Sequence, residues 1–416
     1  SGPTPASANI PGGGQQTFSW TYMAGTASGF VNFTGSASGT DSVSGLPVSS
    51  TPRTSPDCQV QSPASIAISQ ITSDKSVVNT GQSFTVTASV RNTGQETVNA
   101  LAPSALLQSG TGAATVISGP TPVNAALPGS ATQTFSWTLT ATAPGTVYYS
   151  AAAQGTGNNS GLAVEADLST TPAITIMRGA DLSASVAATP GQVSSGQTVT
   201  VVMTVTNAGE VQANAVAPSA LTITGNSGNV TLASGPTPAS VSIPGGQSRT
   251  FTWTYTAGSI AGTVFFTGNA TGTDANSGLP ASSNSDTSNV VMIATPANLT
   301  VSINSSPAGI GQNGTITVTM TVNNTGGAMA NNVSPSALTL GGTSADAAFA
   351  DGPSPASASI AGGGARQFVW HYTAGATAGT VNFTGNASGT DANSGNPITA
   401  AIKTSNNTTI QGAAAL

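Results

Sequence analysis

Apolar and polar side chains alternate along three segments of the chain. Every second residue is apolar from Phe84 to Val90, from Val199 to Val205 and from Ile316 to Val322, and Thr or Ser fills most positions between them. A period of two is typical of an antiparallel strand that buries one face. Asn-x-Gly follows each segment, at residues 92–94, 207–209 and 324–326. Because Asn tolerates the left-handed region and Gly supplies positive φ, we expect a turn at each of these sites.

A second recurring element carries the tryptophans of the chain. Trp20, Trp137, Trp253 and Trp370 are 117, 116 and 117 residues apart, and each has a Phe two positions before it. The motif Ser-Gly-Pro-Thr-Pro or a near copy precedes each tryptophan, at residues 1–5, 118–122, 234–238 and 351–355. Two motifs repeated four times in the same phase indicate a tandem array. The large apolar side chains of each Phe-x-Trp segment share one face, so we expect every Trp to anchor a structural core.

Aligning these motifs divides the chain into three full repeats and one partial copy. We call them repeat 1 (residues 64–178), repeat 2 (179–295), repeat 3 (296–416) and the half repeat (1–63). The half repeat contains its Trp segment but not the alternating segment, so it would expose an apolar face. Three explanations stay open: the sequence is one segment of a longer array, a cleaved front piece remains bound, or another subunit donates the strands.

The spacing of strand and turn signals predicts the fold class. About seven short strands fit in each full repeat, separated by turns every 8 to 12 residues or so. We therefore expect an all-β fold of tandem immunoglobulin-like antiparallel β-sandwich domains. The chain has one cysteine, so the cysteine pair that joins the two sheets of antibody domains is missing and core packing must stabilise each repeat.

These motifs resemble those of CARDB-like and similar immunoglobulin-like repeat domains of bacterial and archaeal cell-surface proteins. The resemblance rests on the alternating strand ending in Asn-x-Gly, on the Phe-x-Trp strand, and on the Gly-Thr-Val strand that follows it, for example at residues 262–264. It covers the three full repeats and the half repeat. The resemblance implies a surface location and a role as stalk, adhesive module or cell-surface layer, and it supplies no catalytic residue.

The low charge of the chain limits the classes of partner that it could bind. Only 5% of the residues are charged, with 13 acidic against 7 basic side chains and a net charge of −6. Nucleic-acid binding needs many more cations to neutralise phosphates, so we expect no such partner. No apolar run reaches 18 residues, so no transmembrane helix is expected. The sequence starts with Ser and has no signal peptide, which suggests a processed product or a piece of a longer chain.

Catalytic chemistry finds little support in the sequence. His371 is the single histidine, and it alternates with Trp370 and Tyr372, so we expect it to face solvent. The other copies have Thr at this position. Because a triad needs His beside a Ser or Cys nucleophile and an acid, we expect no enzyme.

Acidic residues recur in one loop of the repeat. Asp41, Asp274 and Asp391 follow Gly-Thr, and Asn276 and Asn393 lie two residues after the last two. Calcium prefers several oxygen ligands, often carboxylates. One Asp and one Asn per loop favour an Asx-turn, with calcium as the weaker alternative. Apart from that candidate, we expect no cofactor.

Two kinds of modification site are present. Asn32, Asn269, Asn382 and Asn386 begin Asn-x-Ser/Thr sequences in or beside the same predicted strand, so glycans are candidate attachments there. Cys58 lies near the end of the half repeat. An inert buried thiol and a disulfide to another chain or to a missing segment both stay open for it.

Together these features predict a structural extracellular protein: a stalk, sheath, surface-layer or filament subunit that self-associates or packs against neighbouring copies. The alternative is an adhesin or an array of carbohydrate-binding modules on the cell surface. The similarity of the repeats favours the structural role, because a receptor site usually makes one unit diverge.

Overall fold

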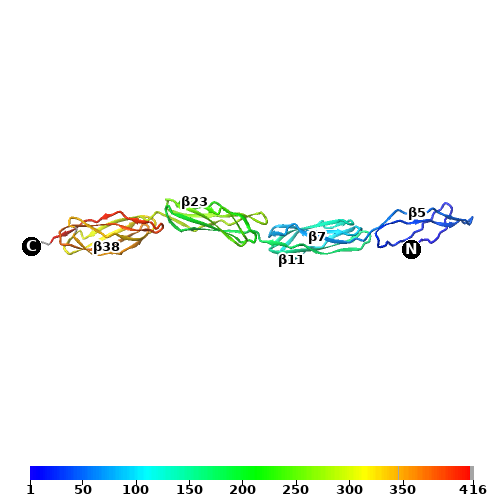
Figure 1. Cartoon of the computed structure of the whole chain (residues 1–416), viewed down its shortest axis with the longest axis horizontal. Coiled ribbons are helices and arrows are strands. Elements are labelled where there is room, and N and C mark those ends of the chain that lie inside the picture. The colour runs from blue at the N-terminus through cyan, green and yellow to red at the C-terminus, as the bar shows by residue number, and fades with distance from the viewer. Residues whose placement is uncertain (345, 413–416) are drawn as a thin grey trace. The chain divides into compact units, whose positions relative to one another are not determined.

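The computed structural model describes residues 1–344 and 346–412, and every regular element within them is a β-strand or β-bridge (Figure 1). The expected all-β class is therefore confirmed. The chain forms two compact units, Ser1–Arg178 and Gly179–Leu416. The described residues include no helix long and apolar enough to cross a bilayer.

The strands follow the repeats. In the half repeat they are β1 (Gly29–Val31), β2 (Thr34–Gly35), β3 (Ser38–Thr40), β4 (Pro47–Ser49), β5 (Arg53–Thr54) and β6 (Cys58–Val60). In repeat 1 they are β7 (Ile66–Ser73), β8 (Val77–Asn79), β9 (Ser83–Asn92), β10 (Val98–Pro103), β11 (Leu107–Gly110), β12 (Ala113–Thr121), β13 (Ala125–Leu127), β14 (Thr132–Ala143), β15 (Gly145–Gly157), β16 (Ala163–Thr170) and β17 (Ile174–Met177).

Repeats 2 and 3 have matching sets of strands. Repeat 2 contains β18 (Leu182–Thr189), β19 (Gln192–Ser194), β20 (Thr198–Asn207), β21 (Ala213–Pro218), β22 (Thr222–Asn226), β23 (Val230–Thr237), β24 (Val241–Ile243), β25 (Ser248–Ala257), β26 (Gly262–Gly268), β27 (Ala270–Asp274), β28 (Pro280–Ser282), β29 (Asp286–Thr287) and β30 (Val291–Ala294). Repeat 3 contains β31 (Leu299–Ser306), β32 (Gly309–Gly311), β33 (Thr315–Asn324), β34 (Ala330–Pro335), β35 (Thr339–Gly341), β36 (Ala347–Ser354), β37 (Ala358–Ile360), β38 (Ala365–Ala374), β39 (Gly379–Gly385), β40 (Ala387–Asp391), β41 (Pro397–Thr399), β42 (Lys403–Thr404) and β43 (Thr408–Gln411).

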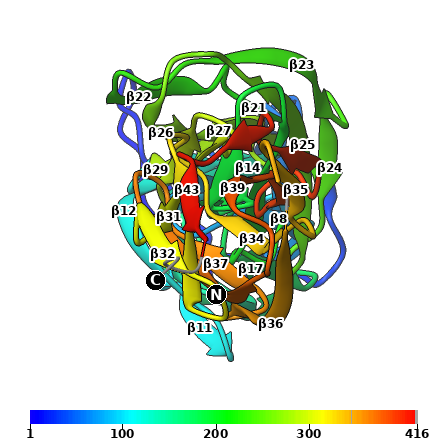
Figure 2. The same cartoon turned by 90° about the vertical axis from the view of Figure 1, so that its left-hand side faces the viewer.

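Each full repeat is a sandwich of two layers. In repeat 2 one layer has the strand order β18-β20-β25-β23, and the other contains β19-β30-β26-β22 and β24-β21-β27-β28. Repeat 3 repeats this order, including the parallel pairing of β32 with β43, which lie side by side in Figure 2. A four-stranded sheet facing a layer closed by a short parallel strand is the immunoglobulin-like arrangement.

The second layer explains why the structure has more strand segments than the roughly seven expected for such a sandwich. In repeat 2 the strand is interrupted at Asn269, which separates β26 from β27. In repeat 3 the same interruption occurs at Asn386. Repeat 1 has one continuous strand there, β15, which joins all of its second layer into a single sheet. Interruption of a strand position is therefore one source of the additional segments.

Alternation along the central strands builds three separate hydrophobic cores. The residues of β20 alternate between buried and half-buried, and Val201 pairs with Trp253 on β25. Trp137, Trp253 and Trp370 are each 2% exposed. The core residues of repeats 1 and 2 cluster within their own repeat, and the core of repeat 3 also includes Ala294 from the end of repeat 2. Fully burying a large aromatic or aliphatic side chain contributes about 1.5–3 kcal/mol to the free energy of folding. Core packing can therefore stabilise each full repeat.

The Asn-x-Gly segments form an Asx-turn, in which the Gly N–H donates to the Asn side chain, and this side chain also makes contacts that the sequence did not indicate. Asn207 is buried, and its Oδ1 accepts hydrogen bonds from the backbone N–H groups of Gly209 (3.1 Å) and Asp181 (3.0 Å). Its Nδ2 donates to the carbonyl oxygens of Val211 (2.8 Å) and Ile243 (3.1 Å). The two other copies, Asn92 and Asn324, make the same four kinds of bond.

The glycine of this motif is required for close approach, not for positive φ. Gly209 is absent from the positive-φ residues of the chain. A Cβ at Gly209 would lie 2.0 Å from the carbonyl oxygen of Gly179. The equivalent contacts are 2.1 Å at Gly94 and 2.0 Å at Gly326. Expecting positive φ here was therefore wrong, because the glycine lets the chain entering the repeat pass directly against the end of the central strand.

The half repeat differs from the other copies in its core. Among residues 1–63, all described, no side chain is buried. Trp20 is 52% exposed, so the expectation that it anchors a core is wrong for the half repeat taken alone. The Trp segment forms no strand and makes a single bridge, Thr4 to Ser19. The physical reason is that residues 1–63 contain no counterpart of β9, β20 and β33. In the full repeats these strands pair with the Trp strand in the same sheet, so in the half repeat the sheet that covers one side of the core is incomplete.

Candidate functional site

In repeats 2 and 3, an Asp side chain at a loop near the end of the repeat accepts a hydrogen bond from the backbone at the start of the same repeat. In repeat 3, Asp391 Oδ1 accepts hydrogen bonds from the backbone N–H groups of Asn393 (3.0 Å) and Ser394 (2.8 Å) and from the Ser394 hydroxyl (2.9 Å). Its Oδ2 accepts a 2.6 Å bond from the N–H of Ala297. We call this arrangement the carboxylate clasp. Asp274 forms the clasp of repeat 2, with Ala180 donating to Oδ2.

The clasp favours an ionised carboxylate. Burial raises the pKa of Asp391, but the N–H donors of Ala297, Ser394 and Asn393 together with the Ser394 hydroxyl outweigh it, so the pKa of Asp391 lies below its ordinary value. Hydrogen bonds to the charged form are the cause of this direction. The clasp therefore holds its negative charge in neutral solution.

Repeat 1 builds the clasp from a different position in the chain. Gly157 replaces the loop Asp there, and Glu96 reaches across from the segment before β10. Its Oε2 accepts a 3.1 Å bond from the N–H of Ala64, and its Oε1 accepts a 2.6 Å bond from the N–H of Ser160. The Ser160 N–H is the largest cause that lowers the pKa of Glu96.

Sequence reasoning missed this role of Glu96. The signal was present as two paired changes: the loop of repeat 1 has no Asp, and a Glu stands where repeats 2 and 3 have Val211 and Ala328. Each change alone looks like ordinary variation. Together they conserve one carboxylate at one place in the fold.

Asp41 of the half repeat forms only part of the clasp. Its Oδ1 accepts bonds from the N–H groups of Val43 (3.0 Å) and Ser44 (2.7 Å) and from the Ser44 hydroxyl (3.0 Å). The Ser44 backbone N–H is the first cause that lowers the pKa of Asp41. Within the described residues no N–H group donates to its Oδ2, the atom that receives the entering chain in the full repeats.

In the second unit the loop of repeat 3 also bonds to repeat 2. Gln197 Nε2 donates to the carbonyl oxygen of Asn393 at 2.8 Å. Asn393 Nδ2 donates to the Ser194 hydroxyl at 3.1 Å, and that hydroxyl donates to Asp391 Oδ1 at 3.4 Å. Asp391 therefore closes its own repeat and contacts the preceding one. We call these bonds the repeat 2–3 joint.

The calcium candidates take the geometry of an Asx-turn. Asn276 and Asn393 direct their backbone N–H groups at the carboxylates of Asp274 and Asp391. N–H groups occupy the lone pairs that a cation would use. Among the described residues no group of three His, Cys, Asp or Glu side chains is close enough to hold a metal ion.

His371 lies on β38 with its side chain 41% exposed, and its Nδ1 is 2.6 Å from Asp351 Oδ1. This is a surface pair on neighbouring strands, β36 and β38. A triad needs a nucleophile on the other ring nitrogen, and the described hydrogen bonds place no Ser or Cys against the His371 ring. The pair has the form of a surface ion pair that contributes little to stability.

The modification candidates lie at accessible positions. Asn32 is exposed, and Asn269, Asn382 and Asn386 are half-buried. Asn32 and Asn382 occupy equivalent positions after Val31 and Val381, with Asn382 Nδ2 donating to Asn407 at 3.0 Å. Cys58 is a free, exposed thiol on β6.

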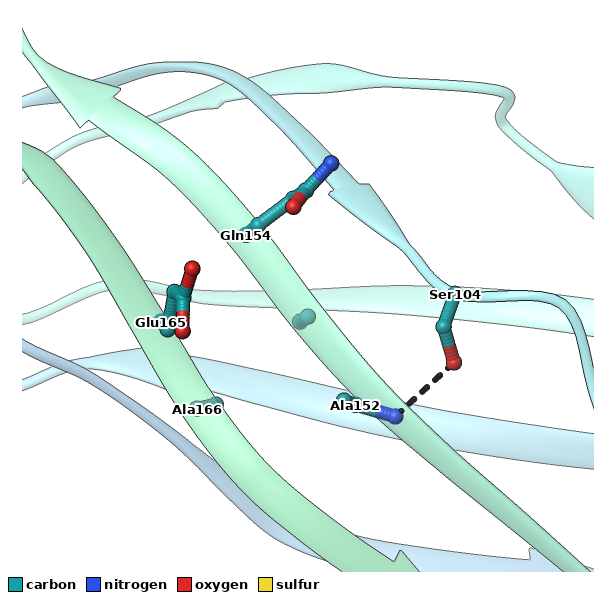
Figure 3. Close-up of a pocket in the computed structure, with 6 residues that line it drawn as sticks. Ser104, Ala152, Gln154, Glu165 and Ala166 are labelled. Carbon is teal, nitrogen blue, oxygen red and sulfur yellow. Dashed lines mark hydrogen bonds between the residues drawn. The ribbon is translucent and has the colours of Figure 1, made fainter.

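Among the described residues, one hollow lies in repeat 1 and another lies in repeat 3. The first, of about 210 Å³, lies in repeat 1 beside Ser104, Gln154 and Glu165 (Figure 3). The Ser104 hydroxyl there accepts a 3.0 Å bond from the N–H of Ala152, so it serves the backbone. The second, of about 620 Å³, lies in repeat 3 and is mainly apolar, with Phe349 at 59% exposure along its wall.

The chain shows only weak similarity to known proteins. No family model matches the sequence, and no curated protein matches it. Solved structures that match include the Escherichia coli adhesin FdeC, at 15% identity over 85% of this chain and 100% of that one, with a TM-score of 0.27. The Yersinia pseudotuberculosis adhesin InvE matches at 19% identity over 56% and 60% of the two chains, with a TM-score of 0.20.

A putative membrane-anchored protein from Corynebacterium diphtheriae matches at 11% identity over 94% of this chain and 97% of that one, with a TM-score of 0.19. Two of these three neighbours are named as adhesins and one as membrane-anchored. At such identities and TM-scores, the likeness carries no argument about what this chain binds.

Proposed function

We propose that the chain is a structural protein of the cell surface, an extracellular array that serves as a stalk, sheath, surface-layer or filament subunit. The carboxylate clasp is the observation that carries this proposal. In each full repeat one buried carboxylate ties the entering chain to a loop about 95 residues away. A domain fastened at the point where the chain enters transmits tension through hydrogen bonds rather than through a loose linker.

The repeat 2–3 joint supports the same role. Gln197, Ser194 and Asn393 bond two successive repeats through side chains that are short and uncharged. Such bonds hold at any ionic strength, since screening by salt weakens only interactions between charges. A low surface charge also suits close packing of neighbouring copies, which would be the partners of such a subunit.

Electron microscopy of the native material tests the proposal. We expect regular polymers, layers or surface projections that a polyclonal antibody to this chain decorates. Dispersed single chains with no surface material would contradict it.

The repeat 2–3 joint can be tested with spin labels placed in repeats 2 and 3 of a protein in which Cys58 is replaced by Ser. In the double variant Gln197→Ala, Asn393→Gly, we expect each repeat to stay folded. The distribution of distances between the two labels should become broader than in the protein with an intact joint.

A second candidate function is carbohydrate binding, and the hollow of repeat 3 favours it. Phe349 exposes most of its ring beside Tyr372, with ring centroids 5.7 Å apart at 76°. Repeat 2 has Leu232 at this position. Exposed aromatic faces are common in sugar sites because they stack on apolar sugar faces. Glycan-array binding that is lost in Phe349→Ala and kept in Leu232→Ala would support an adhesin; no glycan binding by the native chain would exclude this candidate.

A further inference from the structure

The hollow of repeat 3 lies between the edges of the two layers of its sandwich. Strand β35 is the last strand of the sheet β32-β43-β39-β35, and β36 is the last strand of the sheet β31-β33-β38-β36. Leu340 on β35 and Phe349 on β36 line the hollow, and Trp370 and Tyr372 of β38 line it from the core. Among the described residues no charged side chain lines it. The hollow is thus an uncharged opening of about 620 Å³ that reaches the core of the repeat.

The hydroxyl of Tyr372 is a hydrogen-bond donor for which the described residues supply no partner. The residue is only 3% exposed. Every fully buried side-chain nitrogen or oxygen of the described residues has a partner, so the Tyr372 hydroxyl is not sealed inside the core. It is accessible from the hollow that its side chain lines. Burial raises the pKa of Tyr372, so the hydroxyl keeps its proton in neutral solution and can donate it.

Repeat 1 shows the same place closed by a side chain. Gln108 pairs with Tyr149 on β15, as Leu340 pairs with Phe383 on β39, so Gln108 and Leu340 hold equivalent positions. Gln108 Oε1 accepts hydrogen bonds from the Tyr149 hydroxyl (2.9 Å) and from the N–H of Ala114 on β12 (3.1 Å). Gln108 therefore satisfies the tyrosine of its repeat and joins the two edge strands.

Repeat 3 does not have this closure. Its tyrosine, Tyr372, stands on β38, and Leu340 has no polar atom that could accept a bond from it or join β35 to β36. Phe349 is 59% exposed, and its ring lies edge-on to that of Tyr372 with centroids 5.7 Å apart. The hollow thus combines an exposed aromatic ring at its mouth with a free donor on its inner wall.

These two features select the chemical class of the ligand. The apolar lining disfavours an ionised group, which would lose its hydration without gaining a partner. A sugar ring cannot enter whole for the same reason, because its hydroxyl groups would be buried beside a single donor. An acetyl group fits, since its methyl group suits the apolar walls and its carbonyl oxygen can accept a bond from Tyr372. The sugar ring that carries it then stays at the mouth, where Phe349 offers a face for stacking.

We propose that the hollow of repeat 3 binds the acetyl group of an N- or O-acetylated sugar. The Tyr372 hydroxyl donates a hydrogen bond to the acetyl carbonyl oxygen, Leu340 contacts the methyl group, and Phe349 stacks on the sugar ring. This inference rests on the carbohydrate-binding candidate described above, and it adds the group that the hollow recognises.

The test measures the binding of acetylated and unsubstituted oligosaccharides to the full chain by isothermal titration calorimetry. Chitotetraose and cellotetraose form one pair, which differs in an N-acetyl group or a hydroxyl at the same ring carbon. O-acetylated xylotetraose and xylotetraose form the other pair. One hydrogen bond and one buried methyl group should make the acetylated member bind ~10-fold more tightly. A difference in either pair supports the proposal, and the pair that shows it tells whether an amide or an ester is bound.

Fluorine spectra of the protein labelled with 5-fluorotryptophan locate the binding site. Each full repeat contains one tryptophan and therefore gives one fluorine signal. The signal of Trp370, which lines the hollow, should shift when the acetylated sugar binds, and the signals of Trp137 and Trp253 should stay in place. A sugar that shifts Trp137 or Trp253 and leaves Trp370 unchanged would overturn the proposal.

Three variants test the assigned contacts. Tyr372→Phe removes only the hydroxyl, so it should lower the affinity for the acetylated sugar by ~3-fold or more and leave that for the unsubstituted sugar unchanged. Leu340→Gln introduces the side chain that closes repeat 1, and it should lower the affinity for the acetylated sugar at least as much. Tyr255→Phe makes the same change in repeat 2 and is the matched control, with no expected effect. The urea midpoint of Trp370 checks that the two variants of repeat 3 stay folded.

The outcomes separate failure of this inference from failure of the carbohydrate-binding candidate. Equal binding of both members of each pair, lost in Phe349→Ala, would overturn acetyl recognition and leave carbohydrate binding in place. Selective binding that Tyr372→Phe does not change would overturn the role of the hydroxyl and the proposal with it. Absence of binding by all four oligosaccharides would overturn acetyl recognition, and a glycan array then decides separately whether the chain binds any other sugar.

Discussion

The backbone N–H of Ala297 donates a 2.6 Å hydrogen bond to Oδ2 of Asp391, which lies 94 residues later in the chain. This bond joins the segment just before β31, the first strand of repeat 3, to a loop near the end of the repeat. The other oxygen of the same carboxylate organises the loop itself through Ser394. One side chain therefore shapes a turn and closes a domain.

Removing this carboxylate should destabilise mainly repeat 3. Asp391→Ala leaves several N–H groups without an acceptor, and we expect a loss of about 2–3 kcal/mol from the unfolding free energy of that repeat. Urea unfolding of the 5-fluorotryptophan protein measures it, because each repeat contains one tryptophan and Trp370 reports repeat 3. Asp351→Ala, which removes an exposed acid from the same repeat, should change the midpoint little. Equal effects of the two variants would contradict a special role for the clasp.

The clasp also predicts how stability depends on pH. The pKa of Asp391 is lowered in the folded repeat, so the unfolded chain binds a proton more readily than the folded one. The contribution is therefore fully present above the unfolded pKa, about 3.9, and is lost as the pH falls through the folded value.

We thus expect the urea midpoint reported by Trp370 to fall steadily from about pH 5 downward, over the range in which aspartates titrate. Asp391→Asn should flatten this fall, because the amide cannot titrate. A variant that keeps the full acid dependence of the wild type would show that other carboxylates cause it.

The different clasp of repeat 1 allows a sharper test. A Cβ at Gly157 would lie 2.8 Å from both carboxylate oxygens of Glu96, so the two positions cannot both carry an acid. Glu96→Val should lose the clasp, and Gly157→Asp should add a clash and a like charge. The double variant recreates the arrangement of repeat 2, with Val211 and Asp274 at these places.

The double variant should therefore be more stable than the less stable single variant, and the coupling free energy between the two sites should exceed about 1 kcal/mol. The unfolding transition of Trp137 measures all four proteins. If the losses of unfolding free energy in the two single variants simply add in the double variant, the Asp introduced in repeat 1 does not reach the N–H of Ala64.

Much of the architecture could be predicted because the same sequence pattern occurs in all three full repeats. The alternation around Val201 and the period of the tryptophans fix the strand type and the repeat length. The clasp could not be predicted, because a hydrogen bond between Asp391 and Ala297 depends on how distant segments meet. The exposure of Trp20 could not be predicted for a similar reason, since burial depends on the strands that surround a residue and not on the residue itself.

The Asn-x-Gly motif illustrates the same limit. Its residue types fit a turn, and the Gly209 N–H does donate to Asn207 Oδ1 as in an Asx-turn. Asn207 is, in addition, a buried polar node with four hydrogen bonds in all. Single-sequence reasoning identifies local preference, and here tertiary contacts determine the role. The identical positions of Asn92 and Asn324 were the available hint, because turns tolerate substitution better than satisfied buried amides do.

Changing Asn207 to Asp should unfold repeat 2 preferentially. The side chains have nearly the same shape, but Asp replaces the Nδ2 donor by an oxygen that faces the carbonyl oxygens of Val211 and Ile243. Losing two bonds and burying an unpaired charge should cost about 3 kcal/mol or more. The transition of Trp253 should move to lower urea, and it should recover partly at acid pH, where the buried carboxyl takes up a proton.

The exposed change Asn226→Asp in the same repeat is the matched control and should leave the Trp253 transition in place. Because Asn207 Oδ1 would still accept bonds from Gly209 and Asp181 in the Asp variant, any loss comes from the two lost Nδ2 bonds and the buried charge together. A wild-type midpoint for Asn207→Asp at neutral pH would mean that Nδ2 contributes nothing, and the buried node would then reduce to an ordinary turn. Recovery at acid pH, in the opposite direction to the acid loss of the clasp, would identify the buried carboxyl as its cause.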